Sequence, residues 1–435
     1  MSILLDLNLN FNNSYAESFA DLGTFLAQTK LPDPEWVHIS EDVCDLLQLN
    51  KKEVTSARYL NWFAGHHMAK GSKPMAQKYT GHQFGQYNPE LGDGRGLLLG
   101  ELGSSNGRFD IHIKGAGQTP YSRFGDGRAV LRSCIREYLA SEALFHLGIP
   151  TSRALGIFKT SEQIQREKFE TGAALIRVCE SHLRFGHFEY AFYQNDEMLL
   201  QRLVRYTVKQ VLPQDAPEML ALTDDSDIQE QTYQMLKFNI RTTAEMIAKW
   251  QAFGFCHGVM NTDNMSILGL TFDYGPYGFL DEYNPKHICN HSDHSGRYAY
   301  DEQPSIALWN LNALAYALSL LLDKEQLTQL LKGFEPQLLA HYSELMRGKL
   351  GLNQKRSDDQ QLLAELMQLL AADKRDYTNS WRLLSQTQQL NKNSAPFIDH
   401  FINRDAATNW YKKYQTRCNL ENQTPIEREQ QMKAA

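Results

Sequence analysis

Two oxygen-donating side chains in the second half of the chain could hold a divalent cation. Asn264 ends the run HGVMNTDN at 257–264, and Asp273 lies in FDYG at 272–275. Mg²⁺ requires hard oxygen ligands and usually takes only one or two from protein when phosphate oxygens supply others. We therefore predict that Asn264 and Asp273 bind a metal ion together with a phosphate-bearing substrate.

The order of these residues follows the motif order of kinase-like phosphotransferases. Those enzymes carry a His-x-Asp loop with an Asn five residues after the Asp, then a hairpin and an Asp-x-Gly. With His257 as the first residue, Asn264 and Asp273 occupy the metal-binding positions, but Val259 occupies the position of the catalytic aspartate. Valine cannot accept a proton or orient a hydroxyl, so the pattern argues against an ordinary kinase.

A carboxylate nevertheless lies directly before Asn264. Asp263 would approach a bound nucleotide from a shifted position, which suits attack on a different phosphorus, and we predict it as the catalytic base. The alternative is a turn residue, because Asn-x-Asp-Asn segments often form turns. Asp273, at hairpin distance, favours the catalytic interpretation.

A strand lysine and a helix glutamate could serve the same site from the first half. Lys114 ends the alternating run 108–114, and Glu137 lies in a predicted helix at 128–147. In a kinase-like lobe, the lysine binds phosphates and the glutamate holds the lysine. Each residue alone would more often be solvated, so the prediction depends on their order before the later loops.

Glycine-rich runs at 92–95 and 125–128 repeat the tetrapeptide Gly-Asp-Gly-Arg. Glycine lets backbone N–H groups approach phosphate oxygens, and arginine supplies a rigid charged fork. The second run opens the helix at 128–147, whose N-terminus favours anions. Neither run is a P-loop, and a single Gly-Asp-Gly is usually only a turn.

Two arginines add positive charge near the middle of the chain. Against polyphosphate, one arginine can raise a phosphoryl-transfer rate by roughly 10³–10⁵. Arg177 and Arg184 would share one side of a helix, although Ser181 and His182 interrupt that pattern. Surface salt bridges are the alternative interpretation.

The elements that must position these residues differ between the two halves. Strands are predicted at 94–101, 108–114 and 173–178, and the one-sided helix at 128–147 ends before Gly148 and Pro150. Amphipathic helical stretches follow at 231–256, 306–323, 325–345 and 359–372. With the motifs, this layout predicts an α+β, protein-kinase-like two-lobed fold. The sheet-rich N-lobe would span 1–180 with the glycine-rich nucleotide-binding segments, and the mainly helical C-lobe 181–435 with the catalytic and metal-binding loops.

Composition limits the class of protein. The 435 residues are 42% hydrophobic and 22% charged, as in soluble globular enzymes, and the net charge of −7 argues against bulk nucleic-acid binding. The acidic, arginine-free start is neither a secretory nor a transit signal, and the apolar run 311–322 is too short to span a bilayer. Six cysteines without a Cys-x-x-Cys pair favour a reduced compartment. We expect a cytoplasmic protein that binds neither membrane nor nucleic acid.

From about Tyr59 to Asn312, and recognisably through 376–378, the chain resembles the selenoprotein O (SelO/YdiU) family. The resemblance rests on long, unusual motifs: GHQFG at 81–85, LGDGR at 91–95, KGAG at 114–117, TPYSR at 119–123, GDGRAVLRS at 125–133, RFGHFE at 184–189 and HGVMNTDN at 257–264.

The resemblance implies a pseudokinase fold that binds ATP inverted and transfers AMP to Ser, Thr or Tyr hydroxyls of proteins. Some members also transfer UMP from UTP with Mn²⁺, so Mg²⁺ or Mn²⁺ is the expected cofactor. Carried over by position, Asp263 is the base, Asn264 and Asp273 bind the metal, and Lys114 pairs with Glu137. The residues expected to line the nucleotide site are Gly92, Gly94, Arg95, Asp126, Gly127, Arg177 and Arg184.

One feature departs from the family pattern. Members usually continue further and finish near a Cys-containing tail, whereas this sequence ends at Ala435, so we expect a shortened C-terminal tail. Cys289 matches the cysteine that can pair with that tail in bacterial relatives, but its partner is missing from this sequence, so we expect Cys289 to be a simple buried thiol.

Three functions remain open from sequence. The first is AMP transfer to protein hydroxyls, the second ordinary phosphotransfer, and the third a nucleotide-binding pseudokinase scaffold without catalysis. Val259 argues against the second, and the shortened tail leaves the third open. ATP labelled at the α- or γ-phosphate would distinguish them.

Overall fold

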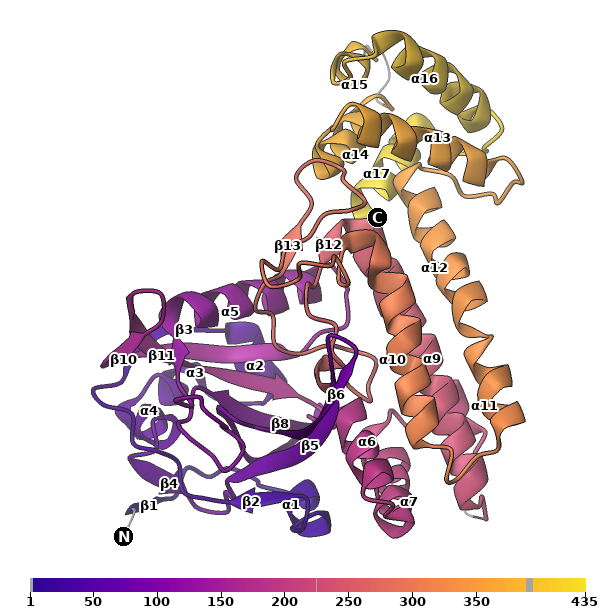
Figure 1. The fold of residues 1–435 in the computed structure, drawn as a ribbon. Helices are drawn as coiled ribbons and strands as arrows, with labels where there is room; N and C mark the ends of the chain where they lie inside the picture. Colours follow the sequence, from indigo (N-terminus) through magenta and orange to yellow (C-terminus); the bar gives the residue numbers. More distant parts are fainter. Residues whose placement is uncertain (1–2, 224, 389–393) are drawn as a thin grey trace. The chain divides into compact units, whose positions relative to one another are not determined.

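A computed structural model describes residues 3–223, 225–388 and 394–435 (Figure 1). The chain forms two compact units. The first comprises Met1–Asn239, Asn261–Gly275 and Asn310–Thr328, and the second Ile240–Met260, Pro276–Trp309 and Gln329–Ala435. The segment at 261–275 therefore belongs with the N-terminal part of the chain, although it is distant in sequence. The predicted division into an N-lobe at 1–180 and a C-lobe at 181–435 remains a prediction.

An antiparallel sheet organises the first unit (Figure 1). Within the described residues it has nine strands, in the order β2-β5-β7-β8-β11-β10-β3, with β6 paired to β5 and β9 to β11. Their bounds are β2 Gly23–Phe25, β3 Glu35–Ile39, β5 Met75–Gln83, β6 Gln86–Gly92, β7 Gly96–Ser104, β8 Gly107–Lys114, β9 Ala129–Val130, β10 Arg153–Gln165 and β11 Phe169–Cys179. A separate parallel pair joins β1 Ile3–Leu5 to β4 His67–Ala69.

The central strands form because their side chains are apolar on both faces. In β7, Leu97, Leu98 and Leu99 are all buried, and Ile111 and Ile113 are buried in β8. Strands covered on both faces need such continuous apolar runs. The predicted strands at 94–101, 108–114 and 173–178 are confirmed as β7, β8 and β11, with β7 beginning two residues later than expected.

Helices cover the sheet and continue the first unit. Helix α5, Leu131–His146, confirms the helix predicted at 128–147 and packs on β10 and β11 through a small apolar cluster that includes Cys134 and Leu175. Helix α6 packs on β5. The other helices that begin before residue 228 are α1 Ser14–Ser18, α2 Glu41–Leu46, α3 Lys51–Val54, α4 Ala57–Phe63, α6 Phe185–Tyr193, α7 Glu197–Tyr206 with a π turn at Thr207–Val211, and α8 Pro217–Leu220.

The remainder of the chain is mainly helical, as predicted. Its helices are α9 Ile228–Phe253, α10 Gln303–Ala317, α11 Lys324–Leu331, α12 Phe334–Lys349, α13 Asp359–Ala372, α14 Tyr377–Gln386, α15 Ala395–Asp399, α16 Arg404–Cys418 and α17 Pro425–Ala434, with one short strand pair, β12 Phe255–Cys256 and β13 Gly278–Phe279. The stretch predicted at 325–345 forms two helices, because the chain is interrupted at Gly333, a poor helix former.

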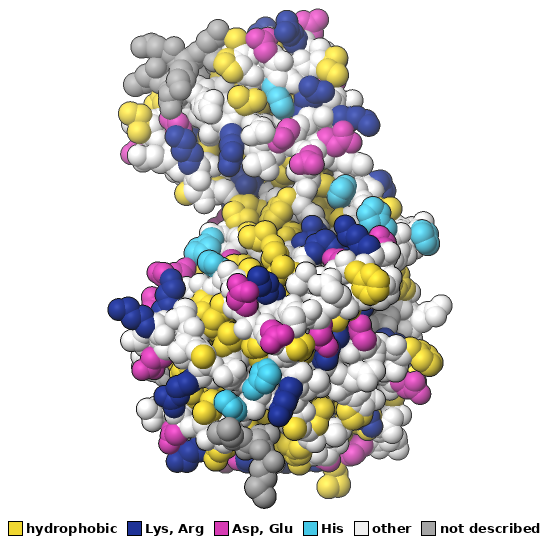
Figure 2. All heavy atoms as spheres, turned by 90° about the vertical axis from the view of Figure 1, so that its left-hand side faces the viewer, with side chains coloured by type: hydrophobic (Ala, Val, Ile, Leu, Met, Phe, Trp, Pro, Cys, Tyr) yellow, Lys and Arg dark blue, Asp and Glu magenta, His cyan; other side chains and the backbone are white. Residues whose placement is uncertain are grey.

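The mixed α and β character that the sequence predicted is confirmed, whereas the kinase-like arrangement of two lobes remains a prediction. None of the helices in the described residues has the length and apolar character needed to cross a membrane. On the face shown in Figure 2, lysine and arginine side chains are interspersed with acidic ones.

Candidate active site

A pocket of about 600 Å³ in the first unit gathers nearly all of the predicted site residues. It is lined by Gly92, Gly94, Arg95, Lys114, Asp126, Gly127, Arg177, Arg184, Asp263, Asn264 and Asp273. Glu137 is the exception, because it does not line the pocket and instead contacts two of the lining cations.

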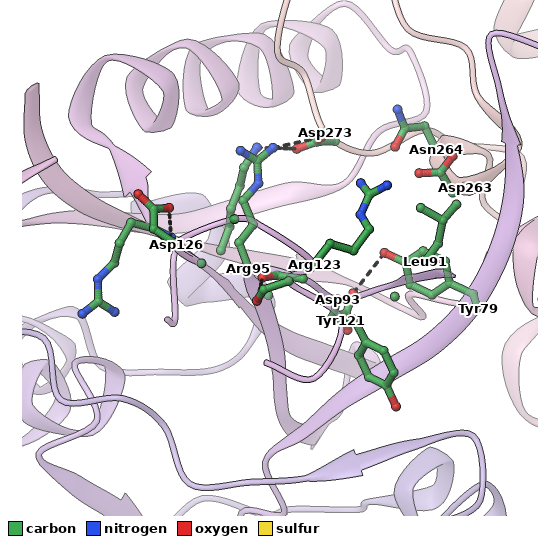
Figure 3. Close-up of a pocket in the computed structure, with 18 of the residues that line it drawn as sticks. Tyr79, Leu91, Asp93, Arg95, Tyr121, Arg123, Asp126, Asp263, Asn264 and Asp273 are labelled. Carbon is green, nitrogen blue, oxygen red and sulfur yellow. Dashed lines mark hydrogen bonds and ion pairs between the residues drawn. The ribbon is translucent and has the colours of Figure 1, made fainter. Parts of the chain in front are cut away.

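A short turn and hairpin deliver the three candidate catalytic and metal-binding residues. Asp263 and Asn264 belong to a 3₁₀ turn at Thr262–Asn264. The chain then reverses, because the Phe272 N–H donates to the Asn264 carbonyl at 3.2 Å and the Thr271 hydroxyl donates to the same carbonyl at 2.9 Å. This reversal places Asp273 on the same pocket as the turn (Figure 3).

Three cations surround the carboxylate of Asp273. Lys114 and the Arg177 guanidinium both bond Oδ1, the latter at 2.8 Å, and Arg95 lies 3.3 Å from Oδ2. Burial alone would raise the pKa of Asp273, but Lys114, Arg95 and Arg177 hold it well below its usual range. The backbone of Asp273 is left-handed (φ 61°), which costs a non-glycine residue on the order of 1 kcal/mol. Asp273 therefore stays ionised and is held in place by its neighbours.

Glu137 does not line the pocket but pairs with two of its cations, Lys114 and Arg177. It is 1% exposed on α5, and its two carboxylate oxygens bond Lys114 and Arg177 respectively. Burial favours its neutral form, yet the two cations outweigh that effect and lower its pKa. The structure thus brings the predicted Lys114–Glu137 pair into direct contact and adds Arg177 to it.

Asp263 has a different environment, because its carboxylate is buried and has no cation bonded to it among the described residues. Its Oδ2 accepts a bond from Gln83 at 3.3 Å, and Oδ1 has no hydrogen-bond partner in the same part of the chain. Burial raises its pKa to about 6, against the opposing effect of Arg184. A carboxylate with a pKa near neutrality can accept a proton from a hydroxyl and release it again.

Arg184 connects the Asp263 turn to the glycine-rich segment. Its guanidinium lies over the rings of Tyr79 and Phe272, at 4.7 and 4.8 Å, and donates to the Asp263 carbonyl at 2.8 Å. It also lies 3.6 Å from Asp93. Arg184 precedes α6 while Arg177 lies in β11, so the two arginines meet at one pocket without sharing a helix.

The second glycine-rich run, at 125–128, lines a part of the pocket away from the turn that carries Asp263. In Figure 3, Asp126 lies on the opposite side of Asp273 from Asp263 and Asn264. Asp126 is half-exposed and forms a two-point ion pair with Arg166, at 2.7 and 3.1 Å. Gly127 has φ 69°, and a Cβ there would lie 2.2 Å from the Gly117 backbone, so this turn requires glycine.

Positive charge predominates in the pocket. Seven lining residues are cationic, namely Arg95, Lys114, Arg123, Arg128, Arg166, Arg177 and Arg184, against four carboxylates, Asp93, Asp126, Asp263 and Asp273. Because several of these cations are buried at low dielectric, a polyanion such as a nucleoside triphosphate would be strongly attracted.

The model of one protein family, described as protein adenylyltransferase SelO, matches residues 6–435. The chain belongs to the SelO family. Three of the relatives that it resembles carry the name protein nucleotidyltransferase YdiU. The protein of Photobacterium profundum is 49% identical over 434 residues, covering 96% of this chain and 84% of the relative. That of Erwinia tasmaniensis is 48% identical over 430 residues, covering 98% and 87%, and that of Yersinia pseudotuberculosis serotype O:1b is 48% identical over 427 residues, covering 98% and 86%.

The pocket also contains residues that were not predicted from the sequence. Asp93 is buried, and its carboxylate accepts from the Gln77 N–H at 3.0 Å and lies 3.3 Å from His112. Burial opposes its charge, but His112, Arg184 and Gln77 lower its pKa to about 2. Asp93 stands within the Gly-Asp-Gly-Arg run, so that motif was the available signal. Gln83 had a weaker signal, since it stands in GHQFG without an evident role.

Cys289 lies outside this site, in the second unit. Its sulfur is 3.5 Å from that of Cys256, which is buried, while Cys289 itself is half-buried. The expectation of a simple buried thiol therefore needs correction, because Cys289 is partly exposed and has a second cysteine beside it.

Proposed function

We propose that this SelO-family chain transfers AMP from ATP to Ser, Thr or Tyr hydroxyls of proteins. The observation that carries the proposal is the pocket in which Asp263, Asn264 and Asp273 meet a cluster of buried cations. Family membership supports nucleotidyl transfer, and Val259 in place of the kinase aspartate argues against phosphoryl transfer.

In the proposed reaction, the acceptor hydroxyl attacks the α-phosphorus of ATP. A new bond forms between the acceptor oxygen and that phosphorus, the bond to the bridging α–β oxygen breaks, and pyrophosphate leaves. The proton of the hydroxyl passes to Asp263. Asp263 lines the pocket, and its pKa, raised by burial to about 6, suits a base that takes up a proton and releases it again.

The cations would bind the phosphates. Lys114 and Arg177 are held from behind by Glu137, so their positions are set before a nucleotide arrives. Preorganised charges of this kind stabilise developing negative charge without reorganisation cost. Inverted binding, with the terminal phosphates deep among Lys114, Arg177 and Arg184 and the α-phosphorus toward the acceptor, is part of the proposal.

Mg²⁺ or Mn²⁺ would be held by Asn264 and Asp273. The donor set fits, since both supply hard oxygens to the same pocket. Asp273 Oδ2 has only the half-exposed Arg95 beside it among its described ion pairs, so one carboxylate oxygen can turn to a metal while Oδ1 stays with Lys114 and Arg177. The ion would neutralise phosphate charge when bound.

A comparison of labelled nucleotides tests the proposal. The purified chain is incubated with a heat-inactivated protein extract, whose own kinases are no longer active, and with ATP carrying label on the α- or the γ-phosphate. We expect protein-bound label from α-labelled ATP only, and its loss in Asp273→Ala. Asp215→Ala, which changes an exposed aspartate of the same unit, serves as the control and should keep full transfer. Label from the γ-phosphate would establish phosphotransfer, and metal-dependent ATP binding without transfer would establish a scaffold.

UMP transfer is proposed as a second activity of the same site. The same experiment with α-labelled UTP, in Mg²⁺ and in Mn²⁺, measures it. Transfer that requires Asp263 and Asp273 with both nucleotides would place both reactions in this pocket, whereas UMP transfer that survives Asp273→Ala would exclude it.

A further inference from the structure

The end of β5 and the turn that follows it are bonded to the turn that carries Asp263. Three consecutive residues make the bonds. The His82 N–H donates to the Thr262 hydroxyl at 2.7 Å, and the Phe84 N–H donates to the Asn261 side-chain oxygen at 3.2 Å. Between them, the Gln83 side chain donates to the carboxylate of Asp263.

The backbones of the two turns also approach closely. A Cβ at Gly81 would lie 2.9 Å from the Thr262 hydroxyl oxygen and 3.3 Å from both the Cβ and the N of Asp263, so the site admits only a glycine without a shift of the neighbouring turn. Phe84 adopts a left-handed backbone (φ 51°), which points its N–H at Asn261. Sequence separations of about 180 residues are thus bridged at several points over four residues.

Gln83 differs from its two neighbours because it acts on the carboxylate itself. His82 and Phe84 hold the turn through their backbone N–H groups, whereas Gln83 contributes a side-chain amide at 3.3 Å from Asp263 Oδ2. That bond leaves Oδ1 as the oxygen without a partner among the described residues. The amide therefore restrains the rotation of the Asp263 carboxylate.

We propose that Gln83 is a positioning residue for the transfer reaction, which holds the carboxylate of Asp263 in the orientation needed to accept the proton of the acceptor hydroxyl. This inference rests on the proposed function, because it needs Asp263 to act as the base. Gln83 itself forms no bond to the reacting atoms. Its contribution is orientation, and loss of orientation lowers the rate of the chemical step more than it weakens nucleotide binding.

The test replaces Gln83 with methionine, which has similar length and no amide donor. We expect kcat for α-label transfer to fall about tenfold, as expected for one lost hydrogen bond to a charged group, with the Kd for ATP unchanged within about twofold. Gln86→Met is the matched control, since Gln86 pairs with Gln83 across the same hairpin and is exposed. It should leave both constants unchanged.

A second variant and a second measurement keep the test decisive. Gln83→Glu keeps the length but removes the donor and adds a like charge, so it should lower kcat further than Gln83→Met. Hydrogen exchange of the amides at 261–264 should become faster in Gln83→Met, and stay unchanged in Gln86→Met. An unchanged kcat in both Gln83 variants, or a loss that appears wholly in the Kd for ATP, would overturn the inference.

Failure of the proposed function gives a different result. If the unmodified chain transfers no α-label, the proposed function is wrong whatever the variants do, and hydrogen exchange then tests only whether Gln83 restrains the Asp263 turn. Faster exchange confined to 261–264 in Gln83→Met would support the bond as the restraint on the Asp263 turn. Unchanged exchange would overturn it.

Discussion

Two buried ion clusters, one in each unit, use similar residues in opposite ways. In the second unit, Arg417 bonds Asp359 at 2.5 Å and Glu421 at 2.7 Å, and Glu421 also accepts bonds from the N–H groups of Asn353 and Gln354. This cluster has one cation for two carboxylates, and backbone N–H groups bond the carboxylate that remains in excess.

In the first unit, by contrast, Lys114, Arg177 and Arg95 share the two carboxylates Glu137 and Asp273. This cluster has an excess of positive charge, and the side chain of Asp273 is 31% exposed toward a pocket. The comparison teaches that burial of ion pairs does not by itself indicate function. An excess of positive charge beside a glycine-rich pocket is the stronger indication, because an anionic ligand can compensate it.

We call the Arg417 cluster of the second unit the closed cluster and the Lys114 cluster of the first unit the open cluster. The largest effect on stability is expected when the closed cluster is broken. Arg417→Met would leave two carboxylates buried without their cation, which costs about 3–5 kcal/mol in the free energy of unfolding. Urea unfolding measures it. Arg382→Met, on an exposed position of α14, should change the free energy by less than about 0.5 kcal/mol. A loss below about 1 kcal/mol for Arg417→Met would contradict the view that this cluster is structural.

Breaking the open cluster should instead reduce activity. Lys114→Met is expected to lower the rate of α-label transfer by about 10²–10³-fold, or about 3–4 kcal/mol, because it removes a preorganised cation from the phosphates. Its effect on unfolding should be smaller than that of Arg417→Met, because Arg177 still pairs with both carboxylates. Lys237→Met, which changes an exposed lysine on α9, is the control. Equal losses of stability in Lys114→Met and Arg417→Met would remove the distinction between the clusters.

The pH dependence of stability can sharpen the description of the open site. The pKa of Asp93 falls from 3.8 to about 2 on folding, so its ionised form contributes about 2 kcal/mol of stability that is present above about pH 4. That contribution is lost as pH falls from about 4 to 2. The difference in unfolding free energy between the unmodified chain and Asp93→Asn should shrink over this range, with Asp215→Asn as control. A difference independent of pH would show that Asp93 is not charged.

The smallest effect is expected at the exposed edge of the pocket. Asp126 and Arg166 are both about a third or more exposed, and surface pairs contribute about 1 kcal/mol or less. Asp126→Asn should therefore change unfolding by less than about 1 kcal/mol and the Kd for ATP by less than about threefold. Isothermal titration measures the second quantity. A change in Kd of about tenfold would show that Asp126 takes part in nucleotide binding directly.

Much of the site could be predicted from sequence because its residues lie in local motifs. The 257–275 segment was recognisable from its spacing, and Lys114 at the end of a strand and Glu137 on a one-sided helix were predicted from their order before that segment. Gly333 was also visible as a helix breaker, yet the periodic pattern across it favoured one helix where two form. Hydrophobic periodicity indicates which face of a helix is buried. It does not indicate where the backbone hydrogen bonds of that helix end.

Other features of the site could not be predicted from neighbouring residues in the sequence. Arg177 and Arg184 were compared on one helix, whereas a strand end and a helix start bring them to the pocket. Gln83 and Asp263 are 180 residues apart, and their bond depends on β5 ending beside the 262–264 turn. Such contacts come from sheet order and packing, which are non-local.

The amino-acid sequence alone determined which chemical groups are available and the order of the elements that carry them, because side-chain chemistry and hydrophobic periodicity are local properties. Only the tertiary structure decided which carboxylates are paired with cations and where the surplus positive charge faces. Those outcomes depend on distances between segments far apart in the chain, and the energy of a charge depends on its neighbours and its burial.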